Sequence, residues 1–233
     1  MHVNGLIVAA GEGKRTGKKT PKAFLSLAGR PMILHTLGRF ATCENVRKVI
    51  LVTLDSEVFR CQELIRSDAR LRSLECVVKP GGPRRQDSVE QGLACLDADC
   101  EVVVIHDGAR PFVSSRLIDR CVEIAFEKGA VVVGVPVRDT IKVVTADSRV
   151  RETPPRKSLW EIQTPQVFRV ELIREAYLRA AQEDLEVTDD AMLVERLGAS
   201  VAVLQGEKTN IKMTFEEDFL FGEALLSKGR ISD

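Results

Sequence analysis

The chain has 233 residues, and 34 Lys and Arg residues balance 34 Asp and Glu residues, so its net charge at neutral pH is zero. This balance and a 5% aromatic content give no reason to expect a nucleic-acid or anionic-membrane partner, and any cationic site must be local. The apolar runs, such as 102–105 and 130–137, are too short to span a membrane, and the chain begins on a predicted strand without a signal peptide. We therefore expect a cytoplasmic protein.

Continuous β-branched runs alternate with helical patterns along the chain. The predicted strands are 4–9, 47–53, 75–79, 101–106, 131–136 and one near 200–205. Three helical patterns lie between them, with apolar residues at Ile33, Leu37 and Phe40, then Val89, Leu93 and Leu96, then Leu117, Cys121 and Ile124. This order predicts one α/β domain over residues 1–233, with a mostly parallel, doubly wound sheet and ligands beyond the carboxyl ends of its strands.

Several residues predict where these helices begin. Pro31 suits the first turn of the first helix, and Ser114 or Ser115 is a good N-cap for the third. The run Thr188-Asp189-Asp190 is typical of a capped, acidic helix start.

The first strand runs into a loop rich in glycine and lysine. Gly11 and Gly13 leave backbone N–H groups open to an anion, and Arg15 and Lys22 supply positive charge nearby. Thr16 stands where both the dinucleotide fingerprint and the P-loop pattern starting at Gly11 require glycine. The loop therefore indicates phosphate binding of another class, and an NAD-linked dehydrogenase is disfavoured.

A loop with two adjacent glycines follows the third predicted strand. Gly81 and Gly82 would let a base edge approach the backbone, and Ser88 would offer a hydroxyl to it, beside the cations Arg84 and Arg85. A plain loop with a capping serine is the alternative.

The strand at 101–106 ends in the sequence His106-Asp107-Gly108. A carboxylate at this place can hold Mg²⁺ against a triphosphate, so Asp107 is a candidate metal ligand. The alternative is a turn aspartate that caps its own backbone. His106 is a weaker candidate, because a histidine at a strand end is usually packed and hydrogen-bonded.

The segment 138–163 breaks the alternation of strands and helices and is too long for an ordinary connection. It predicts a hairpin-like β arm that clasps a second subunit, with an active-site lid or a disordered loop as alternatives. The six cysteines form no CxxC pair and the three histidines are scattered, so we expect no zinc site and cysteines packed as small apolar residues.

Seven short motifs occur in an order that resembles one enzyme family. They are Ala9-Ala10-Gly-x-Gly-x-Arg15 with Pro21-Lys22, Gly82-x-x-Arg85-x-Asp87-Ser88, His106-Asp107-Gly108-Ala109-Arg110-Pro111, Asp139-Thr140-Ile141-Lys142, Thr164-Pro165-Gln166, Thr188-Asp189-Asp190 and Asn210-Ile211-Lys212. Together they resemble the 2-C-methyl-D-erythritol 4-phosphate cytidylyltransferases of the non-mevalonate isoprenoid pathway, over nearly the whole chain.

The resemblance implies a Rossmann-like nucleotidyltransferase fold, a homodimer with exchanged β arms, and the use of CTP and Mg²⁺ to make a CDP-linked methylerythritol. It implies that Arg15, Lys22 and Lys212 are catalytic and that Asp107 is the metal ligand. The implied nucleotide contacts are Ala9, Ala10, Gly11, Gly13, Gly82, Arg85 and Ser88. The implied methylerythritol phosphate contacts are Asp107, Gly108, Arg110, Thr140, Arg156 of the partner's arm, Thr164, Thr188 and Lys212.

One departure from this family and two other functions have to be considered. Pro83 stands where relatives carry an acidic residue, so one contact to the base is in question. A pentitol (ribitol) 5-phosphate cytidylyltransferase would share the fold and the nucleotide chemistry. A non-catalytic nucleotide-binding module is disfavoured, because binding alone does not require Arg15, Lys22, Asp107 and Lys212 together.

Overall fold

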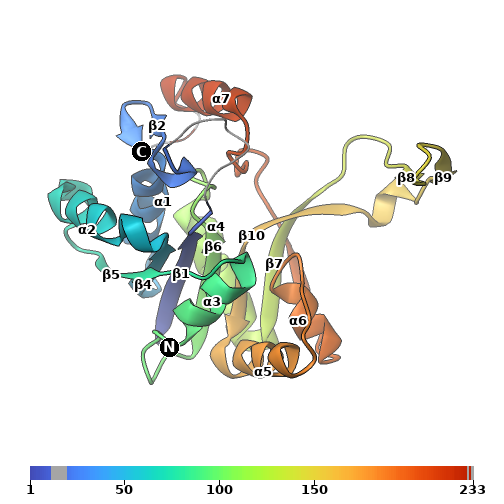
Figure 1. The fold of residues 1–233 in the computed structure, drawn as a ribbon, viewed down its shortest axis with the longest axis horizontal. Helices are drawn as coiled ribbons and strands as arrows, with labels where there is room; N and C mark the ends of the chain where they lie inside the picture. Colours follow the sequence, from blue (N-terminus) through green and yellow to red (C-terminus); the bar gives the residue numbers. More distant parts are fainter. Residues whose placement is uncertain (12–19, 230, 232–233) are drawn as a thin grey trace.

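A computed structural model describes residues 1–11, 20–229 and 231 of the protein. Its centre is a seven-stranded sheet in the order β11-β7-β10-β6-β1-β4-β5 (Figure 1). The strands are β1 (Val3–Ala9), β4 (Val46–Thr53), β5 (Glu75–Pro80), β6 (Val102–Asp107), β7 (Ala130–Pro136), β10 (Trp160–Arg169) and β11 (Ala202–Gln205). All neighbours pair in parallel except β10, which runs antiparallel to both β6 and β7.

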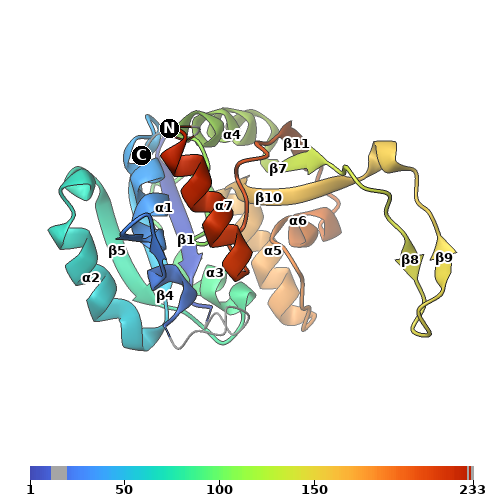
Figure 2. The ribbon, with the colours of Figure 1, turned by 90° about the horizontal axis from the view of Figure 1, so that it is seen from above.

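Helices cover both faces of the sheet, as predicted. The helices α1 (Met32–Ala41), α2 (Val58–Ser67) and α4 (Ser115–Lys128) pack on one face, and α3 (Arg85–Leu93), α5 (Val170–Gln182) and α6 (Ala191–Arg196) pack on the other. Figure 2 shows α4 and α5 on opposite sides of the sheet. Alternate residues of each strand feed the two apolar layers; in β6, Val104 faces one layer and Ile105 the other. None of the described helices is long and apolar enough to cross a membrane.

A third, smaller apolar cluster lies beyond the sheet, beneath α7 (Glu216–Ser227). Leu27, Met32, Ala109, Phe112 and Met213 form its buried part. Leu27 belongs to a short ladder of β2 (Ser26–Leu27) with β3 (Arg30–Pro31), which follows the 3-10 helix η2 (Lys22–Phe24). This cluster anchors both the segment that carries Lys22 and the chain that leads through Lys212 into α7 (Figure 1).

The six predicted strands are confirmed to within two residues at each end, and each of the three helical patterns coincides with a helix, α1, α3 or α4. Ser114 caps α4 by accepting a hydrogen bond from the Leu117 N–H at 3.1 Å. Leu96, assigned to the second helical pattern, lies beyond the end of α3 but is buried all the same. The strand β10 and the helices α2, α5 and α7 have no counterpart among the predicted elements.

The segment after β7 forms a hairpin that extends away from the rest of the chain (Figures 1 and 2). Its strands β8 (Val143–Val144) and β9 (Val150–Glu152) pair antiparallel, and Ser148 between them has a φ of 61°. The chain then passes through the 3-10 helix η5 (Arg156–Ser158) into β10. Residues 160–163 of the predicted arm therefore belong to the central sheet, where they pair with β7.

Candidate active site

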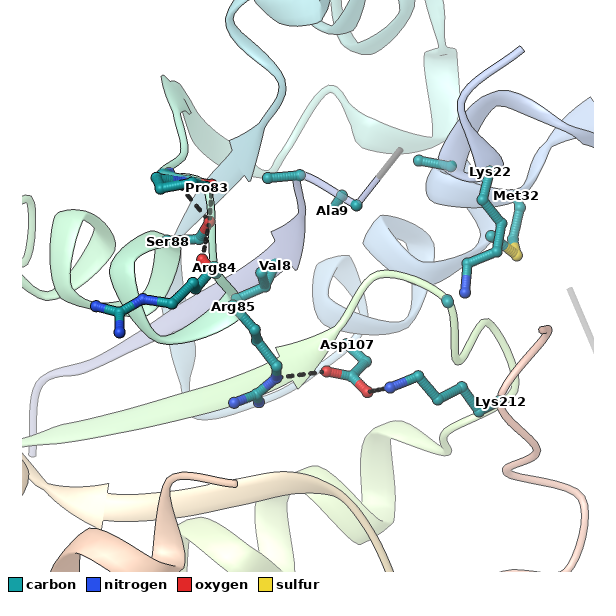
Figure 3. A pocket seen from close by; sticks show the side chains of 15 residues that line it. Val8, Ala9, Lys22, Met32, Pro83, Arg84, Arg85, Ser88, Asp107 and Lys212 are labelled. Atoms are coloured by element: carbon teal, nitrogen blue, oxygen red, sulfur yellow. Dashed lines mark hydrogen bonds and ion pairs between the residues drawn. The ribbon is translucent and has the colours of Figure 1, made fainter. Parts of the chain in front are cut away.

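A cleft opens at the carboxyl ends of β1 and β6 and beside the loop that follows β5 (Figure 3). Its volume is about 280 Å³. It is lined by Val8, Ala9, Ala10, Gly11, Lys22, Ala23, Met32, Gly82, Pro83, Arg84, Arg85, Ser88, Asp107, Ala109 and Lys212. Four of these side chains are cationic and one is anionic, which suits a polyanionic ligand that brings a metal with it.

Asp107 is the electrostatic centre of the cleft. Its Oδ2 accepts a hydrogen bond from Lys212 Nζ at 2.6 Å and its Oδ1 accepts one from Arg85 Nε at 3.2 Å. Figure 3 shows the two cations approaching the carboxylate from opposite sides. Arg110 Nε lies 4.0 Å from Oδ2. Burial raises the pKa of Asp107, but the positive charges of Lys212, Arg85 and Arg110 outweigh it and hold the pKa well below its ordinary value. Asp107 is therefore ionised at neutral pH.

Arg85 joins Asp107 to a second carboxylate. Its Nη2 lies 2.8 Å from Oδ2 of Asp190, which is 1% exposed and precedes α6. Asp190 Oδ1 also accepts a hydrogen bond from the Tyr177 hydroxyl at 2.6 Å. Burial alone would lower the pKa of Arg85, but the negative charges of Asp190 and Asp107 raise it by a larger amount. The guanidinium therefore stays charged. The result is a chain of alternating charges from Asp190 through Arg85 and Asp107 to Lys212.

Close packing shapes the wall between β5 and α3. A Cβ atom on Gly81 would lie 2.7 Å from both Ala10 Cβ and Ser88 Oγ, so only glycine lets this loop approach β1 so closely. The Ser88 hydroxyl accepts a hydrogen bond from the Gly82 N–H at 3.2 Å and lies 3.1 Å from the Arg84 carbonyl oxygen. Ser88 therefore braces the loop, and the prediction that it reads a base is not tested by these contacts.

A second cavity of about 450 Å³ adjoins the first and shares Lys212 with it. Its polar lining includes Arg110, Arg138, Lys208 and Lys212, together with Glu161 and Gln163. Four cations around a cavity of this size fit a small phosphorylated ligand. Lys212 thus stands where two anionic ligands, one in each cavity, would meet.

The structure brings most of the predicted site residues together. Ala9, Ala10, Gly11, Lys22, Gly82, Arg85, Ser88, Asp107 and Lys212 line the first cavity, and Arg110 lines the second. Gly108 packs beneath them, where a Cβ atom would lie 3.0 Å from Ala9 Cβ. Gly13 and Arg15 lie outside the described residues.

Four predicted substrate contacts lie elsewhere or are engaged within the protein. Thr140 and Arg156 are exposed on the arm, where Arg156 Nη1 donates to the Arg138 carbonyl oxygen at 2.9 Å. Thr188 is exposed before α6, with its hydroxyl 3.1 Å from Met192 Sδ. Thr164 is 5% exposed, and its hydroxyl bonds to His106 and to the main chain of Asp107. The roles of these four residues stay predictions.

Several buried polar residues support the site without having been predicted to. Gln166 accepts hydrogen bonds from the Asp190 and Ala191 N–H groups at 3.0 and 3.2 Å. Asn210 donates to the Thr164 carbonyl oxygen at 2.8 Å, and Arg110 Nη1 donates to the Asn210 carbonyl oxygen at 2.8 Å. Gln166 and Asn210 occur in the quoted motifs, so their position was available in the sequence. Tyr177, the single tyrosine of the chain, had no such signal.

The donor set at Asp107 fits a Mg²⁺ ion that is bound mainly by phosphate oxygens. Among residues 1–11, 20–229 and 231, no group of three or more His, Cys, Asp or Glu side chains could hold a metal. Mg²⁺ is commonly bound through one or two carboxylates and substrate phosphates rather than by a complete protein cage. A single ionised carboxylate facing a cationic cleft matches that pattern.

Comparison with known proteins agrees with this geometry. The profile of the 2-C-methyl-D-erythritol 4-phosphate cytidylyltransferase family matches residues 3–228. A curated relative of that name from Alkaliphilus metalliredigens is 43% identical over 97% of this chain and 93% of its own.

Solved structures lead to the same family. The 4-diphosphocytidyl-2C-methyl-D-erythritol synthase of Anaerococcus prevotii superposes with a TM-score of 0.86 at 30% identity, covering 97% of this chain and 96% of its own. The 2-C-methyl-D-erythritol 4-phosphate cytidylyltransferase of Thermus thermophilus gives a TM-score of 0.78 at 36% identity, covering 97% and 98%. This chain therefore belongs to the 2-C-methyl-D-erythritol 4-phosphate cytidylyltransferase family.

Proposed function

We propose that this chain joins CTP and 2-C-methyl-D-erythritol 4-phosphate to give 4-diphosphocytidyl-2-C-methyl-D-erythritol and pyrophosphate. Family membership supports the reaction. The observation that supports the location of the reaction is that Lys212 lines both cavities and forms an ion pair with Asp107. One cavity would take the nucleotide triphosphate and the other the sugar-alcohol phosphate, so that the two phosphates meet at Lys212.

The first cavity is suited to CTP. Lys22 extends into it from η2, and Lys212 lies across from it (Figure 3). These two cations would stabilise the charge that develops on the α-phosphate and on the departing pyrophosphate. Gly82, held by Ser88, would present its backbone to the cytosine, and we propose that Arg15 of the first loop completes the set of cations around the triphosphate.

The second cavity is suited to the attacking phosphate. An oxygen of the methylerythritol phosphate would form a bond to the α-phosphorus of CTP, while the bond from that phosphorus to the bridging oxygen breaks and pyrophosphate leaves with the electron pair. The second pKa of a phosphate monoester is about 6, so the nucleophile is mostly dianionic at neutral pH and needs no general base. Arg110, Arg138, Lys208 and Lys212 would reduce the repulsion between the two anions.

We further propose that Asp107 holds Mg²⁺ together with the triphosphate. Such an ion neutralises phosphate charge and polarises the α-phosphate. Oδ2 of Asp107 would hold the ion beside the Lys212 ammonium group, and the positive charge of the ion would repel that group. A Lys212 side chain displaced in this way would be available to the phosphates.

Pyrophosphate release from CTP and Mg²⁺ tests the reaction, with methylerythritol phosphate and ribitol 5-phosphate as competing acceptors. Turnover with methylerythritol phosphate is expected. Turnover with ribitol 5-phosphate alone would contradict the proposed substrate, and CTP binding without any turnover would indicate a nucleotide-binding module.

We also propose that the arm clasps a second copy of the chain. The arm and the start of β10 expose large apolar side chains that one chain leaves uncovered, at 54% for Val144, 60% for Val150 and 38% for Trp160. Thr140 and Arg156 lie on this arm, so in an arm-exchanged dimer they would reach the partner's second cavity.

Mixed dimers test the shared site. One chain carries Arg156→Ala and the other Lys22→Ala. If Arg156 acts in the partner's site, the mixed dimer has one site with both defects and one intact site, so activity returns although each parent is impaired. If every mixed dimer is inactive, the site is not shared.

A further inference from the structure

The apolar cluster beneath α7 forms part of the wall of the first cavity. Met32 and Ala109 belong to the buried part of this cluster and also line that cavity. Met32 is 0% exposed and Ala109 is 9% exposed, so the cluster is nearly closed to solvent where it meets the cavity. Closely packed side chains do not move independently of one another. The packing of this cluster therefore helps to set the shape of the cavity.

Three chain segments that carry charged residues of the site meet in this cluster. Each segment contributes one charged side chain to the first cavity and one or two buried apolar side chains to the cluster. In chain order, these are Lys22 with Leu27 and Met32, Asp107 with Ala109 and Phe112, and Lys212 with Met213. The distances between the three charges therefore depend on how the cluster packs.

Met213 joins the segment of Lys212 to the other two. It follows Lys212 in the chain and is 0% exposed. Its N–H group donates a hydrogen bond to the Ala109 carbonyl oxygen at 2.8 Å, which ties the main chain beside Lys212 to the loop that follows β6. Its side chain lies in the same cluster as Leu27, which belongs to the segment of Lys22.

Helix α7 packs directly on Met213. A Cβ atom on Gly222 would lie 2.9 Å from Met213 Cε, so glycine lets the main chain of α7 approach this side chain without displacing it. The two residues between Met213 and α7 donate their N–H groups to Asp218 Oδ2 at 2.6 and 2.7 Å, which fixes the start of the helix. Gly222 and this short connection together hold Met213, and with it Lys212, in place relative to α7.

We propose that Met213 is a positioning residue, held in place by α7 through Gly222. It fixes Lys212 at the distance from Lys22 that a triphosphate requires, since the two cations approach the cleft from different segments (Figure 3). None of the described residues that line the two cavities belongs to α7, so the helix acts on the site only through this packing. The inference rests on the proposed function, because it takes Lys22 and Lys212 to be the cations that hold the triphosphate.

Met213→Ala tests the proposal, with Met213→Leu as the conservative variant, because leucine and methionine fill similar volumes. Inorganic tripolyphosphate is the probe, since it carries the charge of the triphosphate without the base or the acceptor. We expect Met213→Ala to weaken tripolyphosphate binding, measured by calorimetry, and to lower kcat by about ten- to hundredfold, as a small misplacement of a catalytic group does. Met213→Leu should restore both quantities.

Two comparisons separate positioning from a loss of stability. Ile173→Ala empties a buried position in the layer that contains α5, and it should leave tripolyphosphate binding unchanged at a temperature at which circular dichroism shows every variant folded. Lys212→Met weakens binding by itself, and adding Met213→Ala should then cause no further loss, because both substitutions remove the same interaction. Unchanged binding in Met213→Ala, an equal loss in Ile173→Ala, or a full additional loss in the double variant would overturn the proposal.

A second test leaves Met213 in place. Alanine favours a helix over glycine, and at Gly38 in α1 the new Cβ atom would lie 3.8 Å from Arg30 Nη1, an ordinary contact. We expect Gly38→Ala to keep the tripolyphosphate affinity of the wild type, whereas Gly222→Ala pushes on Met213 and should weaken it. Equal affinities of these two variants would overturn the proposal. A wild-type enzyme that binds tripolyphosphate but does not turn over CTP and methylerythritol phosphate would contradict the proposed function, while the two variants would still decide the role of Met213.

Discussion

Replacing Arg85 by methionine removes a cation that contacts both Asp107 and Asp190. The substitution keeps a long apolar stem but leaves two buried carboxylates without their shared partner. Removing one member of a buried ion pair typically costs about 3–5 kcal/mol. The Arg85 side chain is 29% exposed, so we take the lower end, about 3 kcal/mol. In a protein of this size, each kcal/mol lowers the unfolding midpoint by about 2–4 °C, which gives a fall of roughly 6–12 °C.

The neighbouring residue supplies a matched control. Arg84 also pairs with a carboxylate, Asp87 at 2.6 Å, but its side chain is 47% exposed. Exposed pairs of this kind contribute little to stability, so Arg84→Met should leave the midpoint nearly unchanged. Thermal melts followed by circular dichroism compare the two variants.

A double variant separates the buried charge from simple loss of packing. Asp190→Asn in the Arg85→Met background removes the buried carboxylate that has lost its guanidinium partner and should recover part of the lost stability, whereas Asp107 keeps its ion pair with Lys212. If Arg85→Met and Arg84→Met melt at the same temperature, or if Asp190→Asn brings no recovery, the charge chain does not stabilise the fold as argued.

Three further predictions concern the same cleft. Gly81→Ala should lower activity more than stability, because its new Cβ atom would collide with Ala10 and Ser88, which line the first cavity. Equal CTP affinity of the wild type and the Gly81→Ala variant by calorimetry would contradict this. Asp107 has a lowered pKa in the folded state, so its contribution to stability is present above the ordinary carboxyl pKa of about 3.9 and is lost as the pH falls further. Urea melts should therefore show a constant gap in stability between wild type and Asp107→Asn above pH 5, and this gap should narrow steadily as the pH falls below 4; a gap that widens in acid would refute the sign. Lys212→Met should bind Mn²⁺ more tightly than wild type without CTP, and by more than Lys22→Met, which removes the same charge from the same cleft; equal gains would show a general charge effect.

The parallel part of the fold could be predicted because its strands carry continuous β-branched runs, as in residues 102–105, which only a sheet covered on both faces can bury. Strand β10 could not be predicted in this way. Within it Gln163, Thr164 and Gln166 are polar, and Pro165 lacks the N–H that a central strand needs. These residues point to a loop by composition, yet the structure buries them between two strands.

The predicted site divides along a similar line. Residues on the loops after strands, such as Gly82 and Asp107, could be placed because the carboxyl ends of parallel strands share one edge. The link from Arg85 to Asp190 joins positions far apart in the chain, and no periodicity or local motif reports such a contact. Thr140 and Arg156 could be assigned only through family resemblance, since their proposed partner is another copy of the chain.

The polar residues that prevented the prediction of β10 from the sequence also hold the segments of the site together. Gln163 binds the segment leading to Lys212, through the Glu207 carbonyl oxygen at 3.0 Å and Asn210 at 3.1 Å. Thr164 holds the main chain of Asp107, and Gln166 holds the start of α6, where Asp190 pairs with Arg85. One antiparallel strand thus contacts all three segments that carry these site residues. Each polar side chain in a buried strand costs desolvation free energy unless a partner satisfies it, and here the partners lie on the segments that carry Asp107, Asp190 and Lys212. Their polarity is therefore a signal of function within a strand rather than a sign that the strand is absent.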